Sequence, residues 1–231
     1  MKNSPLHLVS NRRSSVPNDS GLLCAAHALF SGHKDALLYS YQYASPLDES
    51  DPVCGAQLWD KFVHNSQDYY IYEEETKIVS MLAHKVAINC RNIDTILDLG
   101  PGSKDAILYK SAPIIRAIQP KNYIPVDICE EFVSLAEKQI KFLFPYVDTD
   151  GVCANFFDME QYFKQLKKPV LMMSFGSWIS NIPTATNAGF PRLAVMSQLR
   201  KLIRYLPKGS RLLLSQDACQ DEGKIVRSYS G

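Results

Sequence analysis

The stretch Thr95-Ile96-Leu97-Asp98-Leu99-Gly100-Pro101-Gly102-Ser103-Lys104 runs from a short apolar segment through a glycine turn into a polar pair. A short apolar run that ends at a turn signal is typical of a buried strand, and residues 106–118 then carry apolar side chains at helical spacing. Glycines let the backbone approach a ligand closely, and the start of a helix offers unpaired N–H groups. The stretch therefore predicts a strand, a ligand-binding turn and a helix, in that order.

The same alternation continues along the second half of the chain. Further short apolar runs lie at residues 123–126, 152–156, 170–175 and 211–215, and helical patterns at residues 130–144, 159–166 and 193–206. Parallel strands need crossover connections, which the intervening helices supply. We therefore predict an α/β fold with a doubly wound, mostly parallel sheet, whose ligand binds outside the carboxyl ends of the strands.

Composition excludes several classes of protein. The 231 residues are 46% hydrophobic and 21% charged, which is typical of a globular domain and not of a disordered chain or a coiled coil. A net charge of +1 gives no field that would attract nucleic acid, and no run approaches the roughly 20 apolar residues of a membrane span. Six scattered cysteines without a C-x-x-C pair predict reduced thiols and a cytoplasmic location. The acid-poor start leaves a targeting segment as the alternative.

The first part of the chain has a different character. Its first 50 residues are irregular, and two helical patterns follow. Their apolar residues are Leu58, Trp59, Phe62 and Val63, then Ile78, Val79, Leu82, Ala83 and Val86. We therefore divide the chain into an irregular and helical region, residues 1–90, and a ligand-binding core, residues 91–231.

An acidic residue follows the second predicted strand. Asp127 comes 127 − 100 = 27 residues after Gly100, and a carboxylate here can accept hydrogen bonds from two ribose hydroxyls. Dinucleotide enzymes and S-adenosylmethionine enzymes share this requirement. Asp105 takes the place of the third glycine of a G-x-G-x-x-G turn, so the fingerprint is incomplete, and Asp127 could instead cap a helix.

Polar residues also follow the third and fourth predicted strands. Asn155 can read an adenine edge and Phe156 can stack on it, while Asn181 interrupts apolar neighbours at the mouth of the sheet and suits substrate binding. A loop asparagine, a core phenylalanine and a turn cap before Pro183 are the structural alternatives.

Several enzyme classes lack their signatures in this chain. All five histidines lie in the first half, and neither a G-x-S-x-G elbow nor a G-x-x-x-x-G-K-[ST] loop occurs, which disfavours hydrolases and P-loop enzymes. Methyl transfer needs little acid–base machinery, because the enzyme mainly aligns a neutral nucleophile with an already activated methyl group.

The chain resembles the S-adenosylmethionine-dependent histidine Nα-methyltransferases of ergothioneine biosynthesis from about residue 55 to residue 229. Three groups of segments carry this likeness: Gly55-Ala56-Gln57-Leu58-Trp59-Asp60 with Asp68-Tyr69-Tyr70; Leu97-Asp98-Leu99-Gly100-Pro101-Gly102 with Tyr123-Ile124-Pro125-Val126-Asp127-Ile128; and Phe175-Gly176-Ser177 leading to Asn181.

The resemblance implies a Rossmann-like class I methyltransferase core that binds S-adenosylmethionine and no metal. It also implies methyl transfer to the amine of an amino acid or similar small molecule, with residues 1–90 covering the substrate site. The implied cofactor-binding residues are Gly100, Gly102, Lys104, Asp127, Asn155 and Phe156. The implied substrate-holding catalytic residues are Tyr69, Asn181 and Tyr229. A solvated helix-start lysine and ordinary structural aromatics are the alternatives for Lys104, Tyr69 and Tyr229.

The chain also departs from the family. Its glycine loop is about two residues shorter, Asn155 replaces an acidic residue, and Gly231 comes where the family continues into a substrate-covering region and its last antiparallel strands. Histidine selectivity therefore does not carry over. We expect a partner chain, a missing segment or the N-terminal region to cover the open edge of the strand at residues 211–215.

Two other functions stay open. A nicotinamide-dependent oxidoreductase would share the glycine turn and Asp127. A catalytically silent nucleoside-binding or interaction module would fit the Asn155 exchange and the early end of the chain.

Overall fold

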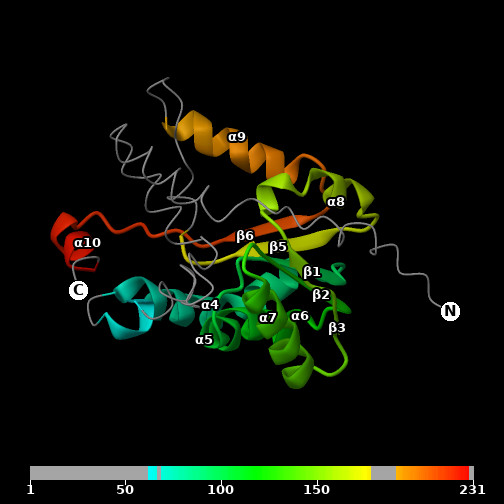
Figure 1. Ribbon diagram of the computed structural model, residues 1–231, viewed down its shortest axis with the longest axis horizontal. Helices are drawn as coiled ribbons and strands as arrows, with labels where there is room; N and C mark the ends of the chain where they lie inside the picture. The colour runs from blue at the N-terminus through cyan, green and yellow to red at the C-terminus, as the bar shows by residue number, and fades with distance from the viewer. Residues whose placement is uncertain (1–61, 67–68, 178–190, 229–231) are drawn as a thin grey trace, which may run out of the picture.

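The sheet is parallel throughout, with strand order β3-β2-β1-β5-β6 and β4 also paired to β2. The computed structural model describes residues 62–66, 69–177 and 191–228 (Figure 1). The strands are β1 (Thr95–Leu99), β2 (Asn122–Asp127), β3 (Asp148–Thr149), β4 (Val152–Cys153), β5 (Val170–Ser174) and β6 (Arg211–Leu214). The predicted doubly wound parallel sheet is confirmed.

Helices cover both faces of the sheet. They are α4 (Tyr70–Asn89), α5 (Lys104–Ala106), α6 (Ala112–Ile118), α7 (Glu130–Leu143), α8 (Glu160–Gln165), α9 (Pro191–Ile203) and α10 (Glu222–Ser228). In Figure 1, α8 and α9 lie on one side of the sheet and α4, α6 and α7 on the other. Successive strand residues point to opposite faces, so Ile96 packs with the α4–α6–α7 layer and Leu97 with the α8–α9 layer, both fully buried. No helix among the described residues is long and apolar enough to cross a bilayer.

The third predicted strand, residues 152–156, is wrong in its extent. Two short strands, β3 and β4, pair with β2 on either side of Gly151, and Phe156–Asp158 is a 3-10 helix. The break has a packing cause: α7 lies so close that a Cβ on Gly151 would be 2.3 Å from Val133 Cγ1. The Gly151 N–H donates to Glu137 of α7 at 2.7 Å instead of to a neighbouring strand.

The helix predicted at residues 106–118 contains a π-helical turn, Ile107–Ser111, between α5 and α6. Such wide turns insert a residue into an α-helix and are frequent at functional sites. Here the turn includes two buried polar residues, Lys110 and Ser111. Their hydrogen-bond partners are Glu75 on α4 and Asp98 on β1.

The apolar stripe predicted on α4 is buried only in part. Val79 and Ala83 enter the core, but Ile78 and Leu82 are 53% and 43% exposed. Residues 62–65 are helical, whereas Leu58 and Trp59 lie outside the described residues. The domain boundary at residue 90 stays a prediction.

β6 forms one edge of the sheet within the described part of the chain. It pairs with β5 on one side, while Arg211 and Leu212 are exposed, and no described strand pairs with its outer edge. The chain then continues into α10, a helix that the sequence patterns did not indicate. The expected cover for this edge therefore remains a prediction.

Candidate functional site

The glycine turn after β1 adopts a conformation that favours glycine. Gly100 and Gly102 have φ angles of +71° and +72°, and the Gly100 N–H donates to the Val126 carbonyl at 2.8 Å. Ser103 caps the following helix, since its Oγ accepts from the Ala106 N–H at 3.4 Å. The turn is therefore fixed directly beside the end of β2.

The strand register brings the predicted nucleoside-binding carboxylate to this turn. Leu99 pairs with Val126, and the Ala154 N–H donates to the Asp127 carbonyl at 2.8 Å. Gly100, Asp127 and Ala154 thus lie side by side where three neighbouring strands end. Asp127 is half-buried and its Oδ1 accepts from the Cys129 N–H at 2.9 Å. Burial raises the pKa of Asp127 to about 6, although hydrogen bonds from the backbone N–H groups of Cys129 and Ile128 lower it in part.

A second carboxylate, Asp98, lies just before the turn and is completely buried. Its Oδ2 accepts from Ser111 Oγ at 2.6 Å and from Tyr123 Oη at 2.7 Å. Its Oδ1 is buried and has no hydrogen-bond partner among the described residues. Burial raises the pKa of Asp98 to about 6, while the two hydroxyl donors and the Lys110 charge oppose the shift. A buried carboxylate oxygen without a donor is an energetic cost that a bound ligand can remove.

The other predicted cofactor residues take less regular positions. Asn155 caps the 3-10 helix, and its side-chain oxygen accepts from the Phe157 N–H at 3.1 Å. Phe156 is half-buried, with its ring centroid 4.7 Å from that of Phe157. Lys104 begins α5 and is exposed.

Of the three predicted substrate residues, the structure describes Tyr69. This side chain is buried directly before α4, with its ring 5.5 Å from that of Phe62 in an edge-to-face arrangement. Asn181 and Tyr229 lie outside the described residues.

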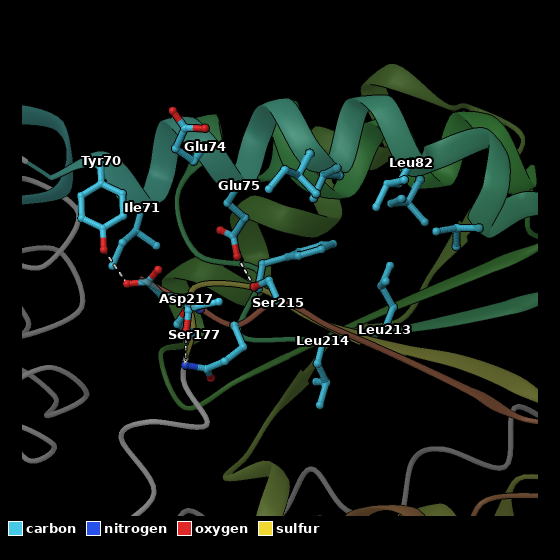
Figure 2. A pocket seen from close by; sticks show the side chains of 17 residues that line it. Tyr70, Ile71, Glu74, Glu75, Leu82, Ser177, Leu213, Leu214, Ser215 and Asp217 are labelled. Atoms are coloured by element: carbon cyan, nitrogen blue, oxygen red, sulfur yellow. Dashed lines mark hydrogen bonds between the residues drawn. The ribbon is translucent and has the colours of Figure 1, made fainter. Parts of the chain in front are cut away.

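A cavity of about 350 Å³ lies between α4 and the ends of β5 and β6. In Figure 2, Leu82 of α4 and Leu213 of β6 face each other across its apolar end. Polar side chains gather at the other end, where Tyr70 Oη donates to Asp217 Oδ2 at 2.6 Å and Glu75 contacts Ser215. The cavity thus joins an apolar groove to a polar rim at the carboxyl edge of the sheet.

Comparison with known proteins assigns the family. A family model described as "Histidine-specific methyltransferase, SAM-dependent" matches residues 37–231. This chain belongs to that family. Its parallel sheet and glycine turn are accordingly those of a class I methyltransferase with a Rossmann-like fold.

Individual relatives are distant and longer. The chain is 25% identical over 227 residues to a histidine N-alpha-methyltransferase of Mycobacterium tuberculosis, covering 94% of this chain and 64% of that protein. It is 25% identical over 181 residues to a 4-dimethylallyltryptophan N-methyltransferase of Trichophyton verrucosum, covering 76% of this chain and 52% of that protein. A solved plantazolicin methyltransferase in complex with SAH matches with a TM-score of 0.47 and 12% identity, over 82% of this chain and 61% of that one. The chain thus spans about half to two thirds of the length of these relatives.

The residues around the glycine turn fit the family's cofactor, S-adenosylmethionine. A Cβ on Gly100 would meet nothing within 4 Å, so open space lies against the backbone there. Asp127 offers an acceptor at one side of this space, and Asp98 has an unpartnered buried oxygen on the neighbouring strand. Ribose hydroxyls and an ammonium group are hydrogen-bond donors that carboxylate oxygens of this kind can accept from.

Sequence reasoning missed several residues of the cavity rim. Asp217 lies just beyond β6, and the rule that ligands bind beyond strand ends could have indicated it. Glu75 had no comparable signal, because it stands in the run Glu73-Glu74-Glu75 and only its burial sets it apart.

Proposed function

We propose that this chain is an N-methyltransferase that transfers a methyl group from S-adenosylmethionine to the amine of an amino acid or similar small molecule. The family assignment supports methyl transfer, and the named relatives act on histidine and on a tryptophan derivative. The observation that carries the proposal is the convergence of the Gly100 turn and Asp127 at adjacent strand ends.

In this proposal the chain mainly binds and orients its two ligands. When bound, the sulfonium cofactor supplies an activated methyl group. Asp127 accepts hydrogen bonds from the ribose hydroxyls of the cofactor. The backbone at Gly100 and Gly102 packs against the cofactor. Asn155 and Phe156 line the part of the site that holds the adenine ring. Lys104 contributes its charge at the start of α5.

We propose that the side chains of Tyr69, Asn181 and Tyr229 hold the amine substrate. Phenol and amide groups can hold the amino and carboxylate groups of an amino acid while leaving the amine lone pair directed toward the methyl group. Tyr69 directly precedes Tyr70, which lines the polar rim of the cavity, and this position supports its part in the assignment.

Calorimetry with S-adenosylhomocysteine and with NAD is the first test. We expect S-adenosylhomocysteine to bind and NAD not to bind. The reverse result would favour a nicotinamide-dependent oxidoreductase and contradict the proposal.

Mass spectrometry of methyl incorporation is the second test. The purified chain would be incubated with S-adenosylmethionine and a panel of free amino acids that includes histidine and tryptophan. We expect a monomethylated or further methylated amine. Cofactor binding without any product would instead support a silent nucleoside-binding or interaction module.

We further propose a cytoplasmic enzyme that acts on small molecules and binds no nucleic acid. The scattered cysteines and the balanced charge support this location and this partner class. We also propose that a partner chain or a further segment covers β6, because Leu212 is 38% exposed at the open edge.

A further inference from the structure

Glu75 connects four parts of the fold through a single buried carboxylate. Its Oε1 accepts from the Gly176 N–H, at 2.7 Å, and from the Ser215 hydroxyl. Its Oε2 accepts from Lys110 Nζ at 2.8 Å. The carboxylate of α4 is therefore bonded to the end of β5, to the end of β6 and to the π-helical turn.

This arrangement is unlike that of the neighbouring acids on the same helix. The side chain of Glu75 is 6% exposed and that of Lys110 is 10% exposed, whereas Glu73 and Glu74 are 72% and 56% exposed. Lys110 Nζ also lies 5.0 Å from the centre of the Tyr72 ring. Burying two charges is costly unless both are fully hydrogen-bonded, and replacing such a pair by apolar groups is often no less stable. Stability alone therefore does not account for the buried pair of Glu75 and Lys110.

The turn held by Glu75 lies at the end of β5, at Gly176 and Ser177. Gly176 and Ser177 both have positive φ angles, +84° and +55°, so this turn is conformationally demanding. Ser177 Oγ accepts from the Asp217 N–H at 2.8 Å, which holds the turn from the other side.

Glu75 also fixes the helix that follows a predicted substrate residue. Tyr69 immediately precedes α4, and Glu75 lies in the second turn of that helix. The Tyr70 hydroxyl adds a contact between the same helix and Asp217. One carboxylate therefore joins α4, which follows Tyr69, to the turn at the end of β5.

We propose that Glu75 is a positioning residue that holds the start of α4, directly after the proposed substrate residue Tyr69, against the turn at Gly176 and Ser177, with Lys110 neutralising its charge. This inference rests on the proposed function. It assigns Glu75 no contact with the cofactor, so its loss would misplace the substrate and leave cofactor affinity unchanged.

The test compares two uncharged double variants, so that neither leaves a buried charge unpaired. In Glu75→Gln with Lys110→Met, the amide oxygen can still accept from Gly176 and Ser215. In Glu75→Met with Lys110→Met, these bonds are lost while the side-chain length is similar. Glu73→Gln, an exposed site on the same helix, is the matched control.

For the Met/Met variant we expect kcat to fall by about 100-fold, the order of loss that a small misplacement of reacting groups causes. S-adenosylhomocysteine affinity should stay at the wild-type value. The Gln/Met variant should keep most of the activity, and Glu73→Gln all of it. Wild-type turnover by the Met/Met variant, or an equal loss in both double variants at matched folded fraction, would overturn the proposal.

Hydrogen–deuterium exchange separates failure of this inference from failure of the proposed function. The amide of Gly176 should exchange faster in the Met/Met variant than in the Gln/Met variant. If the wild-type chain neither binds S-adenosylhomocysteine nor forms product, the proposed function fails, and this exchange difference still decides whether Glu75 holds the turn. Equal exchange in all variants would refute that role.

Discussion

Tyr70 and Asp217 lie 147 residues apart in sequence, yet the tyrosine hydroxyl donates a 2.6 Å hydrogen bond to the aspartate carboxylate. The same carboxylate accepts from the Cys219 N–H through its other oxygen, and Lys224 Nζ lies 3.9 Å from the centre of the tyrosine ring. Burial and the neighbouring carboxylate raise the pKa of Tyr70 far above its usual range, so it stays a donor. The first turn of α4 is thereby fastened to the segment after β6.

Replacing Tyr70 by Phe removes this hydrogen bond and keeps the aromatic ring. We expect the free energy of unfolding to fall by about 1–2 kcal/mol, since the bond has a charged acceptor but is only half-buried. Urea denaturation would measure the change. Tyr109→Phe, at a ring that is 52% exposed, should leave the midpoint unchanged; equal midpoints for both variants would argue against a stabilising role for the bond.

Replacing Asp127 by Ala should weaken S-adenosylhomocysteine binding by about 100-fold, because two hydrogen bonds to a charged acceptor are lost. Titration calorimetry would measure the dissociation constant. Asp148→Ala, at the exposed start of β3 and the opposite end of the sheet, is the control. Unchanged affinity in the Asp127 variant would refute its assignment to the ribose.

Cofactor affinity should also depend on pH. The pKa of Asp127 is raised to about 6, so the carboxyl is ionised at pH 7 and mostly protonated one unit below its pKa. We therefore expect binding about tenfold weaker at pH 5 than at pH 7. If the Asp98→Asn variant shows the same fall in affinity between pH 7 and pH 5, the titrating group is Asp127. If the pH dependence disappears in that variant, the titrating group is Asp98.

A methyl group at Gly100 should affect binding more than folding. Gly100→Ala adds a Cβ to open space beside the turn at φ +71°, and Gly209→Ala adds one at φ +93°, 3.4 Å from Pro169. Each positive φ should cost roughly 1–2 kcal/mol of stability. Only the Gly100 variant should also bind S-adenosylhomocysteine more weakly; equal affinities for the two variants would place the ligand elsewhere.

Asp98 should make the fold less stable as the pH rises. The pKa of Asp98 is raised from 3.8 to about 6 in the folded state, so the folded chain binds more protons in this range and loses stability as pH rises through it. The shift corresponds to about 3 kcal/mol at neutral pH. Asn at this position can still accept from Ser111 and Tyr123 but cannot ionise.

We therefore expect the stability of Asp98→Asn relative to wild type to increase by about 2 kcal/mol between roughly pH 4 and pH 7. Asp127 titrates in both proteins, and the Asp98 charge is the smallest cause of its raised pKa, so most of its contribution cancels in the difference. Guanidinium denaturation across this pH range would measure it. Parallel stability curves would contradict a buried ionised carboxylate at Asp98.

The sequence was most informative where buried strands meet turns. The apolar runs around Leu97 and Met172 indicated central strands, and the rule that ligands bind beyond strand ends indicated Gly100 and Asp127. Both depend on local pattern and on general topology. The strand register makes these two residues neighbours.

Other features depend on contacts that a single sequence does not display. The break at Gly151 comes from the close approach of α7, and the inward position of Lys110 comes from the π-helical turn. Ile78 and Leu82 repeat at the spacing of core residues but line a partly open groove, because no described element covers that side of α4. Periodicity identifies an apolar face, not what packs against it.

The π-helical turn at Ile107–Ser111 also determines how this helix can change length. The wide turn takes up one extra residue, so deleting a residue within it would restore α-helical winding and leave the helix beyond it in phase. Ile114 and Ile115, both fully buried, would then stay in the core, whereas Lys110 and Ser111 would lose the backbone positions from which they reach Glu75 and Asp98. A related chain that is one residue shorter here should therefore keep the core but lack the buried lysine–glutamate pair.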